Sequence, residues 1–280
     1  MKHKHHPGIL FGAIMALLFV NVSRAAELKP ETIRAWEEYV QQKDAAVKSS
    51  AQTPWVAISD NDDCAILRSG KILVAPTGPH IPERVPDGLI HDWIGTAFIP
   101  GATISEVIAA VRDYDRYKDV YHPGVVDSKL VSSGDEEDRF SLMLVNNAVV
   151  VKKAIEGEYR ASYFRIDDHR WYSIAESTRV QEIEDYGASD ERLLPEDHGT
   201  GLIWRLHCIT RYEEQDGGVF MQVEAIALSR DVPVALRWMI DPIVRRVSRS
   251  SLQLSLQQTR GAVQSNLARA EALNVKQGVR

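Results

Sequence analysis

The sequence predicts an α+β fold in which an antiparallel β-sheet packs against one long C-terminal helix. Residues 88–229 contain a series of strand-like segments separated by turn signals, with two short helical patterns after the first strand. Residues 231–268 then carry an amphipathic helical pattern. Because an amphipathic helix must cover its apolar side, and the strands offer the largest apolar surface, we expect the two to pack together.

The composition is that of a globular chain long enough to bury a core. The 280 residues are 44% hydrophobic and 26% charged, with a formal net charge of −6. No basic block is long enough to follow a phosphate backbone, which argues against nucleic acid as a partner.

The first 25 residues are predicted to be a secretory signal. Lys2 and Lys4 precede an apolar run at residues 9–20, and Ser23-Arg24-Ala25 supplies the small residues of a cleavage site. The apolar run is too short to cross about 30 Å of hydrocarbon. Cleavage after Ala25 lowers Lys plus Arg from 33 to 30 against 39 Asp plus Glu, so the net charge goes from −6 to −9. We therefore expect a periplasmic or secreted protein.

Two cysteines, Cys64 and Cys208, remain in the mature chain. An oxidising compartment permits a disulfide between them, but sequence alone does not place them within bonding distance. Neither has a second cysteine at metal-ligand spacing, so no metal site and no cofactor are expected.

Residues 26–87 are predicted to form an N-terminal extension. Residues 30–48 have a helical pattern, residues 55–58 are strand-like, and Gly70 separates two short apolar runs that suggest a hairpin. A loop rich in Pro and Gly ends the extension before residue 88.

The main domain is predicted over residues 88–268. A first strand at 89–99 precedes a helix opened by a capping box of Thr103 and Glu106, and a short helix follows at 113–119. The loop 184–200 is a candidate lid. The six later strands are expected at 125–132, 140–146, 148–166, 169–183, 202–213 and 219–229.

The last helix is predicted either to kink at Pro242 or to begin anew at Asp241. Its apolar face is expected to be Ile243, Val247, Leu254 and Gln258, widened by Val244, Ser251 and Leu252. The opposite face is expected to carry Arg245, Arg246, Arg249 and Arg260. Residues 269–280 are expected to be a polar tail.

At this point the chain resembles the START-like, or helix-grip, superfamily, which includes Bet v 1 allergens, START lipid-transfer domains and polyketide cyclases. The resemblance rests on the element order and on local patterns. With the predicted secretory signal, the chain resembles an exported, bacterial-type member of this superfamily. It implies a curved seven-stranded antiparallel sheet wrapped around the C-terminal helix, with two short helices after the first strand and an apolar tunnel. The patterns are Phe98-Ile99-Pro100, Asp113-Tyr114-Asp115-Arg116-Tyr117, Val125-Val126-Asp127-Ser128 and Asp231-Val232-Pro233.

Strand pairing predicts which side chains line such a tunnel. A hairpin turn at Asp167-Asp168 would place Tyr163 opposite Tyr172, and Tyr159 opposite Glu176. A second hairpin at Asp216-Gly217 would pair Tyr212 with Met221 on an apolar face that also holds Trp204 and the inward-pointing Cys208. The predicted ligand-binding residues are Tyr159, Tyr163, Tyr172, Glu176, Trp204, Tyr212 and Met221.

Glu176 is the predicted polar group of this apolar face. It would bind a ligand hydroxyl or amine, act as a general acid or base with Tyr159 or Tyr172, or be satisfied by a tyrosine hydroxyl or by Arg237. His207 and Glu224 fall on the other face and are interpreted as exposed charges.

Three functions follow from these observations. The first is a non-enzymatic carrier of a lipid or another hydrophobic small molecule, with a possible transient contact to a membrane surface through Arg237, Arg245 and Arg246. The second is a cyclase- or dehydratase-like enzyme that uses Glu176 and Tyr159. The third is a structural or partner-binding protein of the cell envelope, with the N-terminal extension as its interaction surface.

Overall fold

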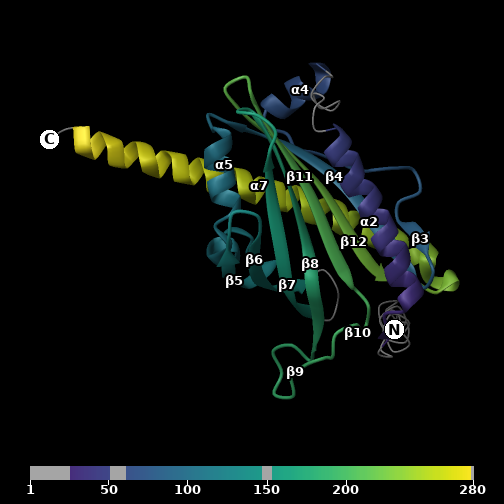
Figure 1. The fold of residues 1–280 in the computed structure, drawn as a ribbon. Coiled ribbons are helices and arrows are strands. Elements are labelled where there is room, and N and C mark those ends of the chain that lie inside the picture. The colour runs from purple at the N-terminus through teal and green to yellow at the C-terminus, as the bar shows by residue number, and fades with distance from the viewer. Residues whose placement is uncertain (1–25, 51–60, 147–152, 279–280) are drawn as a thin grey trace, which may run out of the picture.

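The computed structural model describes residues 26–50, 61–146 and 153–278 (Figure 1). The predicted signal at residues 1–25 and the strand-like run at 55–58 lie outside the described residues.

Seven long antiparallel strands build the sheet. Alternating apolar residues and the turns between them place each strand close to its predicted position. The seven are β4 (Gly88–Pro100), β5 (Val125–Ser133), β6 (Asp138–Asn146), β7 (Lys153–Arg165), β8 (Arg170–Glu184), β11 (Arg205–Gln215) and β12 (Gly218–Arg230).

The strand order across the sheet is β4-β12-β11-β8-β7-β6-β5. Short strands extend it to ten: β2 (Leu73–Pro76) and β3 (Glu83–Val85) pair with β4, and β9 (Arg192–Leu193) pairs with β8. A separate pair joins β1 (Ala26–Glu27) to β10 (His198–Gly199). The predicted α+β class is confirmed, and in the described residues the main sheet has three short strands beyond the seven expected.

The helices after the first strand are also confirmed. The Thr103 hydroxyl accepts from the Glu106 backbone N–H, and the Glu106 carboxylate accepts from the Thr103 N–H, so the capping box opens α5 (Ile104–Val111). A 3-10 turn, η1 (Tyr114–Arg116), then leads into α6 (Tyr117–Val120).

The long helix α7 (Val234–Gly278) lies on the inner face of the sheet, and its C-terminal part projects beyond the sheet edge (Figure 1). It is one helix that contains Pro242, so the alternative of a second start at Asp241 is wrong. The segment predicted as a polar tail at 269–280 is helical as far as Gly278.

The face that α7 buries differs in part from the predicted one. Leu252, predicted at the side of that face, is buried together with Leu256, whereas Ile243 and Leu254 are 51% and 46% exposed. The reason is Gly95 of β4: a Cβ there would lie 2.6 Å from Leu256 and 3.0 Å from Leu252. A glycine on the sheet thus fixes which helix side approaches it.

A first strand, two short helices, six further strands and a C-terminal helix, in this strand order, form the helix-grip architecture. Of the helices within the described ranges, none is long and apolar enough to cross a membrane.

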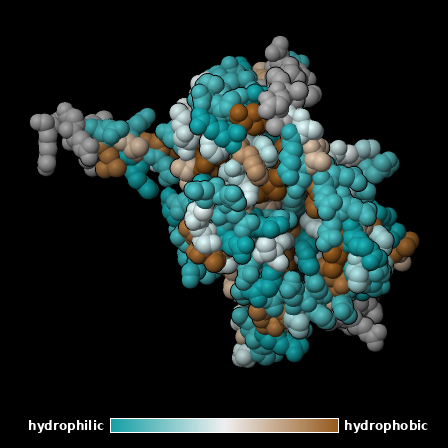
Figure 2. Space-filling view, in the orientation of Figure 1, coloured by the Kyte–Doolittle hydropathy of each residue, from teal (hydrophilic) through white to brown (hydrophobic). Residues whose placement is uncertain are grey.

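The outer face of the sheet is covered by helix α2 (Pro30–Ser50). Trp36 and Val40 pack on Ile226 and Leu228 of β12, and Val47 packs on Ile209 of β11. The molecule therefore has three layers: α2, the sheet and α7. The side that carries α2 is mostly hydrophilic, with hydrophobic side chains in small separate patches (Figure 2).

A second helix, α4 (Asn61–Arg68), covers the upper end of the same face. Its Leu67 and Cys64 pack against Phe98 and Phe220. The hairpin predicted at Gly70 is therefore wrong in its first half, which is helical. Gly70 itself makes the turn into β2, with φ of +88°.

Candidate ligand-binding site

Four small side chains cross the middle of the inner face in one row that begins at a tryptophan. The strand pairing places Trp93 opposite Ala225, Ala225 opposite Cys208, Cys208 opposite Ala175, and Ala175 opposite Ala161. Opposed residues share a face, so these five side chains form a continuous path from β4 to β7. We call them the small-residue row.

The centre of this row is only partly buried, although it lies in the middle of the sheet. Ala225, Cys208 and Ala175 keep intermediate exposure, whereas Ile209 and Ile226 on the opposite face are 0% and 1% exposed. Burial nevertheless raises the pKa of the Cys208 thiol to about 11, so the group is deep in the protein. Deep side chains that stay accessible indicate space between sheet and helix.

The position of α7 explains this space. The helix packs chiefly on β4, and its buried Leu252 and Leu256 sit against Gly95 at one side of the sheet. The helix makes few contacts with β11 and β8, although Tyr212 and Trp171 of these strands belong to the same hydrophobic cluster as its leucines.

An aromatic cluster closes the far end of the row. The rings of Phe140 and Tyr159 stack at 5.3 Å, and those of Tyr114 and Phe140 at 4.2 Å. Tyr159 is 6% exposed, and its hydroxyl has no hydrogen-bond partner among the described residues. Burial raises the pKa of this hydroxyl, so it stays protonated and can donate to a ligand oxygen.

A polar network holds the cluster in place. Asp138, 1% exposed, accepts two hydrogen bonds from the Arg112 guanidinium at 2.8 Å and one from the Tyr114 hydroxyl at 3.1 Å. Tyr114 also bonds Tyr163 at 2.9 Å. Burial alone would raise the pKa of Asp138, but the hydrogen bonds from Arg112 and Ser133 lower it. The carboxylate is thus fully engaged in tying α5 and η1 to the sheet.

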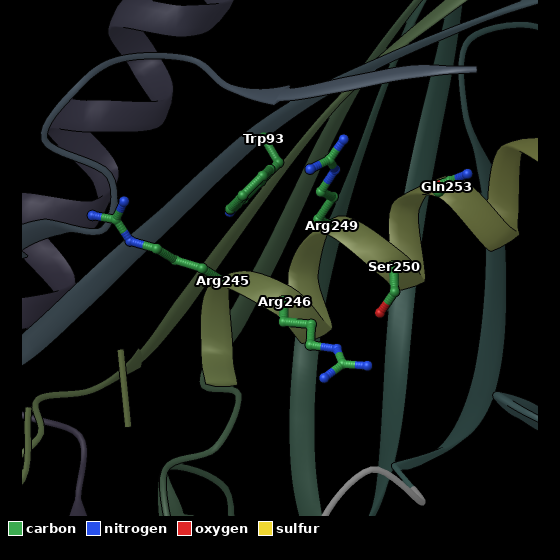
Figure 3. Close-up of a pocket in the computed structure, with 6 residues that line it drawn as sticks. All are labelled: Trp93, Arg245, Arg246, Arg249, Ser250 and Gln253. Carbon is green, nitrogen blue, oxygen red and sulfur yellow. The ribbon is translucent and has the colours of Figure 1, made fainter. Parts of the chain in front are cut away.

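A hollow opens at the other end of the row, beside Trp93. Its volume is about 330 Å³. Three arginines of α7 surround it, and Figure 3 shows their side chains spread around the helix next to the Trp93 ring. The lining residues are Trp93, Arg245, Arg246, Arg249, Ser250 and Gln253.

The structure divides the seven predicted ligand-binding residues between the two faces. Tyr159, Tyr163, Tyr212 and Met221 lie on the inner face, and Cys208 points inward as predicted. The other three, Tyr172, Glu176 and Trp204, lie on the outer face, where Tyr172 packs with Val47 and Trp204 with Trp36. The predicted faces of these three are therefore wrong.

For Tyr172 and Glu176 the cause is a change in register between β7 and β8, whereas Trp204 lies just before β11, outside the alternation of that strand. The turn spans residues 166–169, so Arg165 pairs with Trp171 rather than with Arg170. A shift of one residue moves every side chain to the other face. Tyr159 consequently pairs with Ser177, and Glu176 pairs with Arg160.

Glu176 is therefore a member of an outer ion pair. The Arg160 Nε donates to its carboxylate at 2.7 Å, and the group is about one-third exposed. Tyr159 lies on the opposite face of the sheet, so the acid–base pair predicted for an enzyme does not form.

His207 and Glu224 are also corrected, because α2 buries them. They are 2% and 6% exposed. His207 Nε2 lies 2.9 Å from Asp44 of α2, and Lys43 of α2 pairs with Glu224 at 2.8 Å and with Asp92 at 2.6 Å. The sequence interpretation failed because it did not place α2 over this face.

The small-residue row and the aromatic cluster were missed from sequence. Ala225 and Ala227 are two positions apart on one strand and therefore share a face. Two alanines on one face are a sequence signal of a face that small side chains do not fill. Tyr114 and Phe140 belong to distant segments, and only the fold brings them together.

Both cysteines are free. Cys64 lies on the outer face and Cys208 on the inner face, so the sheet separates them and the disulfide left open from sequence does not form. In the described part of the chain, no group of three His, Cys, Asp or Glu side chains is arranged to hold a metal ion.

No family model and no curated protein matches the chain. Solved structures do resemble it. A STAR-related lipid transfer protein fragment from Xanthomonas axonopodis is 17% identical, with a TM-score of 0.41 over 70% of this chain and 98% of that one. Human STARD10 is 8% identical, with a TM-score of 0.44 over 80% and 87%.

The Zhui aromatase/cyclase from Streptomyces sp. R1128 is 10% identical, with a TM-score of 0.41 over 64% of this chain and 96% of that one. Likeness at this level carries no argument about ligand or activity. The fold assignment rests on the strand order and the placement of α7 in this chain, which has the helix-grip fold.

Proposed function

We propose that the protein is a carrier that holds a lipid or another hydrophobic small molecule between the sheet and α7. The observation that supports this most directly is the small-residue row, whose centre stays accessible in the middle of the sheet. An apolar surface with a few converging polar groups is the usual composition of a ligand site.

The chemistry of the row favours hydrocarbon. Ala161, Ala175 and Ala225 offer no hydrogen-bonding side chain, and each methylene removed from water on such a surface contributes about 0.8 kcal/mol. The unpartnered Tyr159 hydroxyl at the far end supplies one polar anchor.

The carrier would work outside the cytoplasm, after removal of residues 1–25. The pattern of Lys2 and Lys4, the apolar run and Ala25 supports this part of the proposal. N-terminal sequencing of the exported protein should begin at Ala26, and an intact Met1 terminus in a cytoplasmic fraction would contradict it.

A transient membrane contact belongs to the same proposal. Val234 and Trp238, one helical turn apart at the start of α7, are 73% and 78% exposed. Trp is favoured where a membrane meets water, and nearby arginines suit an anionic surface.

Filling the space tests the carrier function. Ala225→Phe places a ring in the centre of the small-residue row, and Ala268→Phe adds the same ring on the exposed, projecting part of α7. We expect Ala225→Phe to weaken binding of Nile red and of co-purifying ligand at least tenfold, and Ala268→Phe to leave both unchanged.

Urea unfolding of the same variants separates an open site from a closed core. A ring that enters free space should leave stability nearly unchanged, whereas overpacking a filled core costs about 1–3 kcal/mol. A destabilised Ala225→Phe protein with undiminished ligand binding would refute the proposed site.

A further inference from the structure

One stripe of α7 changes character along its length. The residues of this stripe are three or four positions apart, or seven apart across the Pro242 segment, so their side chains lie on one side of the helix. Its C-terminal members are buried against the sheet and its N-terminal members are exposed. The buried members are Leu252, Leu256, Thr259 and Val263, and the exposed ones are Val234, Trp238, Arg245 and Arg249.

The change occurs where the helix passes Trp93. On the C-terminal side, Gly95 lets the helix pack directly on β4. Beside Trp93, two residues earlier on the same strand face, the helix carries arginines rather than leucines. Their side chains spread in different directions around the helix, and they line the hollow of about 330 Å³ together with Trp93 (Figure 3).

The three arginines of this hollow lack counter-charges. Among the residues that the structure describes, no carboxylate lies within ion-pairing distance of Arg245, Arg246 or Arg249. Other arginines at the same end of the molecule are paired: Arg237 bonds Asp231 at 2.7 Å, and Arg84 bonds Asp231 at 3.2 Å. Although the net charge of the chain is −6, the guanidinium groups of these three arginines line one hollow without a neighbouring carboxylate.

The hollow adjoins the small-residue row at Trp93. Trp93 is both a wall of the hollow and the first member of the row, directly opposite Ala225. A molecule whose head sits among the arginines can therefore lay its tail along Ala225, Cys208 and Ala175 toward Tyr159.

We propose that the ligand is an anionic amphiphile. Its carboxylate or phosphate head binds Arg245, Arg246 and Arg249 in the hollow, and its acyl tail covers the small-residue row. The guanidinium group stays charged at every physiological pH and forms paired hydrogen bonds with planar or tetrahedral oxyanions. This inference rests on the proposed carrier function and adds the charge of the ligand head and the residues that select it.

A comparison of ligands with one tail and different heads tests the proposal. Palmitic acid, hexadecanol and 1-palmitoyl lysophosphatidic acid compete for bound Nile red on the full mature chain and on a variant with Arg245→Gln, Arg246→Gln and Arg249→Gln. We expect this variant to bind both acids at least tenfold more weakly and hexadecanol within twofold of the wild type. The tighter acid identifies the head as a carboxylate or a phosphate.

The matched control removes three exposed arginines elsewhere. Arg34→Gln, Arg139→Gln and Arg269→Gln make the same change in net charge outside the hollow, and we expect wild-type affinity for all three ligands. An equal loss of acid binding in the control would attribute the effect to net charge and overturn the proposal.

Three other results would overturn the proposal, and each has a different meaning. If the wild type binds none of the three ligands, the carrier function itself fails. If the hollow variant keeps its affinity for the acids, the carrier function stands and the arginines do not select the head. Loss of co-sedimentation with phosphatidylglycerol vesicles, with acid binding intact, would assign the arginines to a membrane surface instead.

Discussion

At the scale of single residues, burial decides which polar groups can take part in function and which only affect stability. His91 lies on the inner face, 8% exposed, with its Nε2 atom 2.8 Å from the Ser229 hydroxyl. Burial lowers its pKa to about 4, against a small opposing effect of Asp241. The imidazole is therefore neutral in the folded protein near neutral pH.

This shift predicts a loss of stability in acid. Since the pKa is about 4 in the folded chain and about 6.5 when unfolded, the unfolded chain binds more protons, and stability falls as the pH drops from about 6.5 to 4. The full effect is about 3 kcal/mol. Urea unfolding should show that His91→Gln loses less stability over this range than the wild type.

The exposed His80 provides the control. His80→Gln should follow the wild-type pH profile. A His91→Gln profile parallel to the wild type would show that His91 takes up its proton equally well in both states.

Residue identity alone could not place Glu176. The alternation of β7 and β8 correctly predicts two faces, one apolar and one charged, but the turn at residues 166–169 decides which residues belong to each. The Asp216-Gly217 turn was predictable because both residues adopt positive φ, 59° and 76°, which fits a two-residue hairpin. The pairs Tyr212–Met221 and Cys208–Ala225 followed correctly from it.

At the scale of elements, the approach of α7 to β4 determines the shape of the candidate site. The close contact at Gly95 holds the helix to one side of the sheet and leaves the small-residue row accessible. Helical periodicity predicted α7 but not its buried face, because the deciding residue is a glycine on a strand more than 150 positions earlier.

Gly95→Ala should therefore destabilise the protein. In most strands this change is favourable by about 0.5–1 kcal/mol. Here the new methyl group would meet Leu256 at 2.6 Å and Leu252 at 3.0 Å. We expect a net loss of about 1–3 kcal/mol in urea unfolding, because the packed leucines must move.

Gly78→Ala is the comparison, since a Cβ at Gly78 meets nothing within 4 Å. It should match the wild type or slightly exceed it in stability. Equal effects of the two substitutions would mean that α7 does not pack closely on β4.

At the scale of the whole molecule, the three layers make residues 26–50 part of the fold. From the sequence, they were predicted to belong to an N-terminal extension that serves as an interaction surface. In the structure, α2 supplies Trp36 and Val40 to the outer core and the cation to a buried charge cluster. The apolar side of this helix is thus already covered by the sheet.

That cluster is centred on Lys43. Its ammonium group lies 2.6 Å from Asp92 and 2.8 Å from Glu224, whose side chains are 0% and 8% exposed, and Tyr39 donates to Asp92 at 2.7 Å. Burial alone would lower the pKa of Lys43, but its bonds to the two carboxylates raise it. The ion pairs therefore join α2 to β4 and β12.

Removing the cation tests whether α2 is integral. Lys43→Met leaves two buried carboxylates without their lysine, which typically costs about 3–5 kcal/mol. Lys48→Met changes the same charge at an exposed position of the same helix and should cost little. Urea unfolding of both variants should show one cooperative transition, shifted strongly only by Lys43→Met. If Lys43→Met leaves the transition unmoved, α2 does not stabilise the domain, and an interaction role for residues 26–50 would again be favoured.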